Sequence, residues 1–156
     1  GERTPLMDAH ARGAWLGLTA ATSKAAMMRA AFEGVTFSLR AGKDALLRAG
    51  HRIAALHLAG GGSLHPWWRQ LLAEALGMPL LSAATGDDGA ASARGAALLA
   101  GLGTGHWNAR QLPELFAPSS VVAVPRADAM FMQRYAAHAQ ATAHLQELNE
   151  KLLLTA

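Results

Sequence analysis

The stretch Leu58–Gln70, with the sequence LAGGGSLHPWWRQ, is the most informative part of the chain. An apolar run leads into three consecutive glycines, and Ser63 is expected to open the amphipathic helix that follows. Because glycine has no side chain, a flat or charged ligand can lie against the bare backbone of such a turn. The helix N-terminus would offer that ligand N–H groups and a partial positive charge. The alternative is a tight corner where glycine only relieves crowding, and the glycines alone favour neither interpretation.

The composition is that of a globular chain long enough for one domain. It has 156 residues, a formal net charge of +3 and no cysteine, which excludes a disulfide framework and thiolate chemistry. It contains no uncharged apolar run of about 18 residues, so no membrane partner is expected and a cytoplasmic location fits. The arginines are spread singly, which argues against nucleic-acid binding. The chain opens on a charged turn without an initiator methionine, and we interpret it as a piece of a longer protein.

Hydrophobic periodicity predicts alternating helices and strands after an irregular segment at residues 1–22, in which Ala14–Leu18 is a possible strand. The expected helices are residues 23–49, Ser63–Leu76, a segment capped by Asp87 or Asp88 that ends in Gly101–Gly105, and a last helix from about Arg126. The expected strands are Ile53–Ala59, buried and parallel, and Met78–Ala83. Residues 106–125 are expected to be a loop with a short helix near Ala109–Leu115. This order indicates an α/β fold whose further strands would lie upstream of this chain.

The helix expected at residues 23–49 has two different faces. One stripe is bulky and the other is made mostly of small residues: Met28, Phe32, Val35, Leu39, Gly42 and Leu46 on the first, and Met27, Ala31, Gly34, Ser38, Ala41 and Ala45 on the second. Both faces are expected to be covered. Because its side chains are small, the second face lets another backbone or a flat ligand approach closely. Close packing against another helix is the favoured interpretation, and a bound flat ligand is the alternative. Thr22 or Ser23 is expected to cap the helix and Gly50 to end it.

Other catalytic motifs are incomplete. The segment Gly61–His65 lacks the second glycine of a nucleophile elbow, and no P-loop is present. A dinucleotide fingerprint is weakened because its third glycine and the acid after the next strand are missing. The seven histidines show no metal-ligand spacing. The sequence therefore offers a glycine turn without an accompanying catalytic group.

Individual polar and aromatic residues mostly have structural interpretations. His57 is expected to be a buried, hydrogen-bonded imidazole, while His65 either edges a ligand at the glycine turn or lies exposed. Glu33 needs no catalytic role as a surface charge or a buried structural acid. Trp67 and Trp68 are expected to anchor the core or an interface rather than to stack on a ligand.

Several ordered motifs are similar to one family, the FGGY carbohydrate kinases. GERTP at Gly1–Pro5, ARGAWLGLT at Ala11–Thr19 and RAAFEGV at Arg29–Val35 resemble the C-terminal half of those kinases. The GGGS of Gly60–Ser63 followed by WRQLLAE at Trp68–Glu74 resembles their adenosine-binding motif. The segments Gly77–Pro79, Thr85–Gly89 and Gly95–Ala100 continue the similarity. Within the family, the GERTP opening is typical of the xylulose kinases.

The resemblance implies an α/β fold that is part of an actin-like (RNase H-like) ATPase domain, with helices packed on a mixed sheet. Residues 1–156 would be the C-terminal segment of the second such domain, with a long terminal helix from about residue 126. The chain would be the ATP-binding part of a sugar kinase that phosphorylates a ketopentose, D-xylulose first. Another sugar or polyol substrate, or a non-catalytic nucleotide-binding module, is the alternative.

The resemblance also implies a set of site residues. Gly60, Gly61 and Gly62 would line adenine and ribose with Ser63, His65 would contact the nucleotide, and Gly17 would lie near the phosphates or ribose. Trp68 and Gln70 would support the motif from its helix. The cofactors would be ATP and Mg²⁺ bound through it, and the partners would be ATP, ADP and the sugar, in a possible homodimer of the full enzyme. The general-base aspartate and most of the sugar pocket are expected upstream, so the isolated chain is expected to be inactive.

Overall fold

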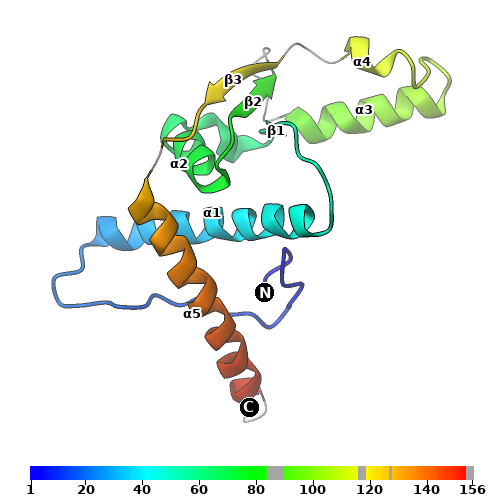
Figure 1. The fold of residues 1–156 in the computed structure, drawn as a ribbon. Helices are drawn as coiled ribbons and strands as arrows, with labels where there is room; N and C mark the ends of the chain where they lie inside the picture. Colours follow the sequence, from blue (N-terminus) through cyan, green and yellow to red (C-terminus); the bar gives the residue numbers. More distant parts are fainter. Residues whose placement is uncertain (84–89, 116–118, 127, 154–156) are drawn as a thin grey trace. The chain divides into compact units, whose positions relative to one another are not determined.

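The computed structural model describes residues 1–83, 90–115, 119–126 and 128–153. They form two compact units. The first comprises Gly1–Arg52, Glu74–Leu76 and Ala127–Ala156, and the second comprises Ile53–Ala73 and Gly77–Arg126. The elements in chain order, labelled in Figure 1, are α1 (Lys24–Arg48), β1 (Leu56–His57), η1 (Gly61–Leu64), α2 (Pro66–Leu76), β2 (Leu80–Ala83), α3 (Ala91–Gly103), α4 (Leu112–Leu115), β3 (Ser119–Ala123) and α5 (Ala129–Leu153).

Helix α1 begins and ends where local sequence signals place its ends. The Ser23 hydroxyl accepts a hydrogen bond from the backbone N–H of Ala26 at 3.1 Å, so Ser23 is the N-cap. At the other end Gly50 has φ of +87°, its N–H donates to the Leu47 carbonyl, and the next N–H, of His51, donates to the Leu46 carbonyl. This is the Schellman motif, which needs a left-handed residue at the position of Gly50. The predicted bounds of this helix are therefore confirmed.

The core of the first unit lies where α5 crosses α1 (Figure 1). Phe37 and Phe131 are almost fully buried, and their ring centroids are 5.0 Å apart. Tyr135 and His138 follow on successive turns of α5, with rings 5.5 and 5.3 Å from Phe37. Burying one Phe side chain stabilises a fold by about 2 kcal/mol or more, so this aromatic cluster holds the two helices together.

The stripe of α1 that packs is the small one. An added Cβ on Gly34 would lie 4.0 Å from His138 Nε2. Ser38 donates a hydrogen bond to the Glu2 carboxylate at 3.3 Å. Close packing at this face is thereby confirmed.

The bulky stripe of α1 is not covered by the described residues. Its apolar members are 39–53% exposed: Met28, Phe32, Val35, Leu39 and Leu46. The prediction that both faces are covered is therefore wrong for this chain. The physical reason is that α5 packs on another side of the helix, against Glu33 and Phe37. The N-terminal segment reaches the bulky stripe at Gly42, where an added Cβ would lie 3.3 Å from Thr4 Cγ2, and leaves the large apolar side chains of the stripe exposed. Amphipathic periodicity identifies an apolar face but does not say which neighbour reaches it.

The N-terminal segment is irregular, as predicted, and the possible strand at Ala14–Leu18 does not form. An isolated antiparallel bridge joins Glu2 and Asp8, and the Glu2 carboxylate also accepts the Leu6 N–H at 2.8 Å. The indole N–H of Trp15 donates to the Met27 carbonyl at 3.2 Å, which fastens the segment to α1. Side-chain contacts rather than a ladder therefore order this region.

The second unit contains a three-stranded mixed sheet in the order β1-β2-β3. β1 is parallel to β2, with Leu56 opposite Leu80, and the Leu58 N–H extends the ladder to the Leu81 carbonyl at 2.8 Å. β3 is antiparallel to β2. Residues 106–125 were expected to form a loop with a short helix, so the prediction missed β3. The β-branched pair in Ser119–Ala123, followed by Pro125, is a signal that could have indicated a strand.

The strand expected at Ile53–Ala59 is parallel but shorter and less buried than predicted. Only Leu56 and His57 are assigned to it, Leu56 is half-buried and His57 is exposed. The expectation of a buried His57 is therefore wrong. The reason lies in the pairing, because among the described residues β1 has only β2 beside it.

Helix α3 ends in a second Schellman motif. Gly105 has φ of +71°, and the N–H groups of Gly105 and His106 donate to the Leu102 and Gly101 carbonyls. The expected caps Asp87 and Asp88 lie outside the described residues, and α3 begins at Ala91. α4 falls within the short helix expected near Ala109–Leu115. None of the described helices is long and apolar enough to cross a membrane.

Candidate functional site

The glycine turn directly follows β1. Gly60 has φ of +93° and ψ of 163°, a backbone conformation that is essentially restricted to glycine. Gly61–Leu64 then form one turn of 3₁₀ helix. His65 is extended, with φ of −86° and ψ of 119°, and α2 begins at Pro66. The turn is therefore separated from the helix by one extended residue.

The expectation that Ser63 opens the helix is wrong. Proline is favoured at the first position of a helix, where its missing N–H costs nothing, and it drives the residue before it out of the helical region. Pro66 therefore places the helix start three residues later and leaves His65 at the N-cap position, without a side-chain cap hydrogen bond. The N-terminus of α2 still lies next to the glycines along the chain, across this break.

Crowding does not explain the glycines. A Cβ built on Gly60 or on Gly61 meets no described atom within 4 Å. Position 60 requires glycine because its φ is positive, whereas the φ of Gly61 is not positive. For Gly61, neither backbone conformation nor a neighbouring atom among the described residues accounts for the missing side chain. As far as the described part of the chain extends, the backbone at this position therefore faces open space.

The turn lies at the edge of the sheet where ligands bind in open α/β folds. Because β1 and β2 are parallel, their carboxyl ends share one edge. The glycine turn follows the first, and residues 84–89 follow the second. Ligands of such sheets bind in the crevice outside the carboxyl ends of the strands. Thr85–Gly89, in which the similarity to the family continues, lie outside the described residues.

Helix α2, which follows the turn, is anchored in the second unit by residues on its first two turns. The Gln70 side chain donates to the Val124 carbonyl at 3.0 Å, which links α2 to the chain after β3. Trp68 is half-buried and Leu71 and Leu72 are buried. Trp67 is 43% exposed, so it is not a core residue of this chain.

Two further predicted site residues lie in different units. His65 is exposed and directly follows the glycine turn, and its contact with a ligand stays a prediction. Gly17 has φ of +72° and faces open space, but it belongs to the first unit and the glycine turn to the second. The approach of Gly17 to the nucleotide therefore stays a prediction.

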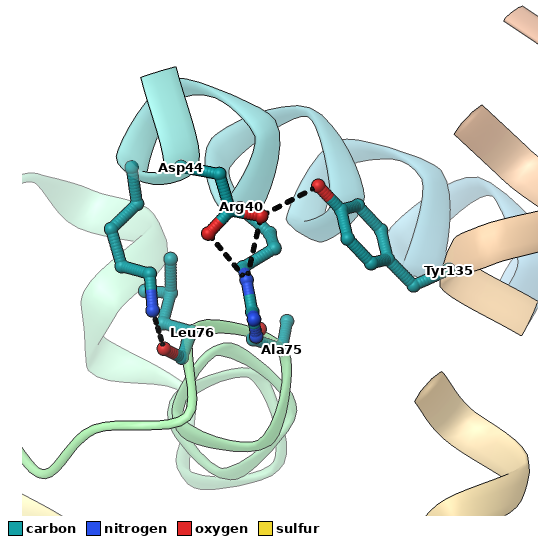
Figure 2. Close-up of polar contacts among 6 residues, drawn as sticks. Arg40, Asp44, Ala75, Leu76 and Tyr135 are labelled. Carbon is teal, nitrogen blue, oxygen red and sulfur yellow. Dashed lines mark hydrogen bonds and ion pairs between the residues drawn. The ribbon is translucent and has the colours of Figure 1, made fainter. Parts of the chain in front are cut away.

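The C-terminal end of α2 is held by a polar cluster that the sequence analysis did not single out. Arg40 donates to the Ala75 carbonyl at 2.7 Å, and the Lys43 ammonium donates to the Leu76 carbonyl. Arg40 also contacts both oxygens of Asp44, which accepts a third hydrogen bond from Tyr135 (Figure 2). The spacing of Arg40 and Asp44 by four residues was the available sequence signal.

Burial changes the protonation behaviour of this cluster. Desolvation lowers the pKa of the Lys43 ammonium, and the neighbouring Arg40 charge lowers it further. Desolvation raises the pKa of the Tyr135 hydroxyl, and its hydrogen bond to Asp44 acts in the same direction. Tyr135 is thus kept as a neutral donor to the carboxylate.

Glu33 is a buried acid with two cationic partners. Its carboxylate lies 2.8 Å from Arg29 Nε and 3.2 Å from Arg134 Nε, the latter on α5. The hydrogen bond to Glu33 raises the pKa of Arg29. These contacts fit the structural interpretation of Glu33. Among the described residues, no three His, Asp or Glu side chains converge into a metal site.

Comparison with known proteins identifies the family. The FGGY family of carbohydrate kinases, C-terminal domain, matches residues 1–104, and the chain belongs to this family. Xylulose kinase of Staphylococcus epidermidis is 36% identical over 105 residues, covering 67% of this chain and 21% of that protein. Xylulose kinase of Escherichia coli is 39% identical over 100 residues, covering 64% and 20%. Glycerol kinase of Variovorax paradoxus is 37% identical over 118 residues, covering 72% and 23%.

A solved structure shares the fold. The ligand-bound xylulose kinase from Lactobacillus acidophilus is 27% identical and superposes with a TM-score of 0.65, over 98% of this chain and 30% of that one. The predicted α/β architecture with a mixed sheet, as part of an actin-like domain, is therefore confirmed. The chain spans about a fifth of the length of the curated relatives it matches.

Proposed function

We propose that this chain is the ATP-binding part of an FGGY sugar kinase, which transfers the γ-phosphoryl group of ATP to a hydroxyl of D-xylulose. Xylulose kinases among the relatives and the GERTP opening support this substrate. Glycerol kinases are similar at nearly the same identity, so glycerol is the second candidate. Residues 1–156 would be the C-terminal segment of the second actin-like domain, and the general base would lie on a part of the enzyme outside this chain.

The observation that carries the proposal is the open space in front of Gly61. The described residues give no steric or conformational reason for the missing side chain. Because the position also lies after β1, at the carboxyl ends of two parallel strands, a ligand lying on the backbone explains it. In this proposal Gly60, Gly61 and Gly62 contact adenine and ribose, Ser63 and His65 border them, and Gly17 lies near the phosphates or ribose. Bound MgATP supplies the phosphoryl group, and this chain orients it for in-line transfer.

The experiment compares glycine variants in the full-length protein. Gly61→Ala and Gly61→Val introduce side chains without backbone strain, so the fold is expected to stay intact while the KM for ATP rises. A loss of about 1.4 kcal/mol of nucleotide binding corresponds to a tenfold rise, and Val is expected to exceed this and Ala to fall below it. Gly103→Ala is the matched control, because that position is also open but lies at the end of α3. An unchanged KM for ATP in both Gly61 variants would contradict the assignment.

Substrate identity needs a separate measurement. The ratio of kcat/KM for D-xylulose to that for glycerol, measured on the unmodified enzyme, separates the two candidates. Calorimetric titration with ATP, ADP and NAD measures which nucleotide binds, and so tests the alternative of a non-catalytic nucleotide-binding module. Binding of ATP without phosphorylation of any sugar or polyol would favour that alternative over a kinase.

A further inference from the structure

The bulky stripe of α1 is a long apolar surface that the described residues leave open to water. From Met28 to Leu46 it contains no polar residue, and it follows about 27 Å of helix at 1.5 Å per residue. Its large apolar side chains are 39–53% exposed. Soluble proteins rarely leave so extended an apolar surface in water unless something binds to it.

The N-terminal segment adds a fixed aromatic side chain at the start of α1. The indole N–H of Trp15 donates to the Met27 carbonyl at 3.2 Å, which holds the ring beside the first turn of the helix. Trp15 is nevertheless 52% exposed, and Leu16 and Leu18 are 63% and 52% exposed. A large aromatic side chain that is held in place but half open to water is typical of an anchor at an interface.

The composition of the stripe indicates the kind of partner that fits it. Interfaces between proteins that also exist apart are about as polar as the rest of the surface, whereas a face without polar residues resembles a domain core cut in half. Such a face has to be covered as the protein folds, because exposed apolar surface favours aggregation. The partner is therefore a second apolar surface that is present whenever this one is.

The remainder of the polypeptide meets this requirement. The chain spans 20–23% of the length of the curated relatives and 30% of the solved xylulose kinase, so those kinases contain several times as many residues. A segment of the same polypeptide is held at a high effective concentration beside the stripe, whereas a second copy has to arrive by diffusion. Covalent connection thus favours the same polypeptide over a second copy.

We propose that the bulky stripe of α1, with Trp15 at its beginning, is the face on which another part of the same kinase polypeptide packs through an apolar surface of its own. This inference rests on the proposed function, in which residues 1–156 are one part of a longer enzyme. The stripe is then an internal surface of that enzyme and is not a contact between subunits.

The test measures the accessibility of single cysteines in the full-length enzyme. Residues 1–156 contain no cysteine, so a thiol introduced into α1 is identified by mass spectrometry after reaction with a maleimide. Val35→Cys and Leu39→Cys place the thiol within the stripe, and Ala30→Cys, at an exposed position of α1 outside the stripe, is the matched control. Each rate is divided by that of the same variant unfolded in urea. We expect the two stripe variants to react about 50-fold or more slowly than the control.

The outcomes depend on labelling rates and not on catalysis. Slow labelling of the stripe variants that is independent of enzyme concentration supports the inference. Rates equal to that of Ala30→Cys overturn it, and so does protection that falls on dilution, because a second copy then covers the stripe. Val35→Cys changes the side-chain volume least and decides the test if Leu39→Cys does not fold. The Gly61 variants test the proposed function separately through the KM for ATP, so a failure of either conclusion is recognised by itself.

Discussion

Replacing Glu33 by Gln tests the ion-pair arrangement between α1 and α5. The substitution keeps the volume of the side chain and removes its charge. Glu33 is 7% exposed, so water compensates weakly for the loss of that charge. We expect the substitution to lower the free energy needed to separate α1 from α5. The size of the loss depends on the two partners of Glu33, Arg29 and Arg134.

The two arginines contribute unequally. Arg29 is four residues from Glu33 on the same helix and its side chain is 57% exposed, so its pair is worth only about 0.3–0.5 kcal/mol. Arg134 Nε is buried and has no hydrogen bond within the described atoms, so its charge is compensated by Glu33 Oε2 at 3.2 Å. Leaving a buried donor uncompensated costs about 1–3 kcal/mol. The Arg134 side chain as a whole is 38% exposed, so water screens part of this cost. The expected loss for Glu33→Gln is therefore about 1–2 kcal/mol, against about 0.5 kcal/mol for Arg29→Met.

Amide hydrogen exchange of α1 and α5 in the full-length protein measures this loss. A cost of about 1–2 kcal/mol corresponds to exchange faster by about 5- to 30-fold in the protected amides of both helices. Glu147→Gln, an exposed acid on α5, is the control and is expected to change exchange less than about twofold. The reasoning is refuted if Glu33→Gln behaves like this control, or if Arg29→Met costs as much as Glu33→Gln.

Two further predictions concern backbone conformation and pH. Gly77→Ala places a side chain on a residue with the left-handed φ of +64°, so it is expected to destabilise α2 by about 1–2 kcal/mol. Faster amide exchange in α2 measures this loss. An effect no larger than that of Gly103→Ala would contradict the prediction. Burial lowers the pKa of His138 from 6.5, so the unfolded chain binds a proton that the folded one resists, and stability should fall as the pH drops from about 7 to about 5. Replacing His138 by Phe should flatten this part of the thermal-stability profile, and an unchanged slope would count against the assignment.

The features predicted correctly from sequence are those that local chemistry determines. Ser23 and Gly50 set the ends of α1 because a cap and a left-handed residue act within one turn of the helix. Gly77 ends α2 for the same reason. The place of the glycine turn after β1 also follows from the order of apolar and glycine residues along the chain.

The features missed depend on neighbours distant in sequence. The packed face of α1 is decided by α5 and the N-terminal segment, which reach the small stripe at Gly34 and Ser38. The support of α2 by Arg40 and Lys43 joins residues more than thirty positions apart, and no local pattern indicates it. The helix start at Pro66 was a local signal, but the serine three residues earlier was given more weight than the proline.

The contrast between Gly60 and Gly61 has an evolutionary consequence. Every single-nucleotide change that replaces glycine introduces a side chain, so at Gly60 each one strains the backbone whether or not the protein still binds a ligand. A relative that has lost its activity should therefore keep glycine at position 60 and let position 61 drift. Variation at position 61 in relatives that keep glycine at position 60 would thus indicate that selection for ligand binding has been lost while the fold is kept.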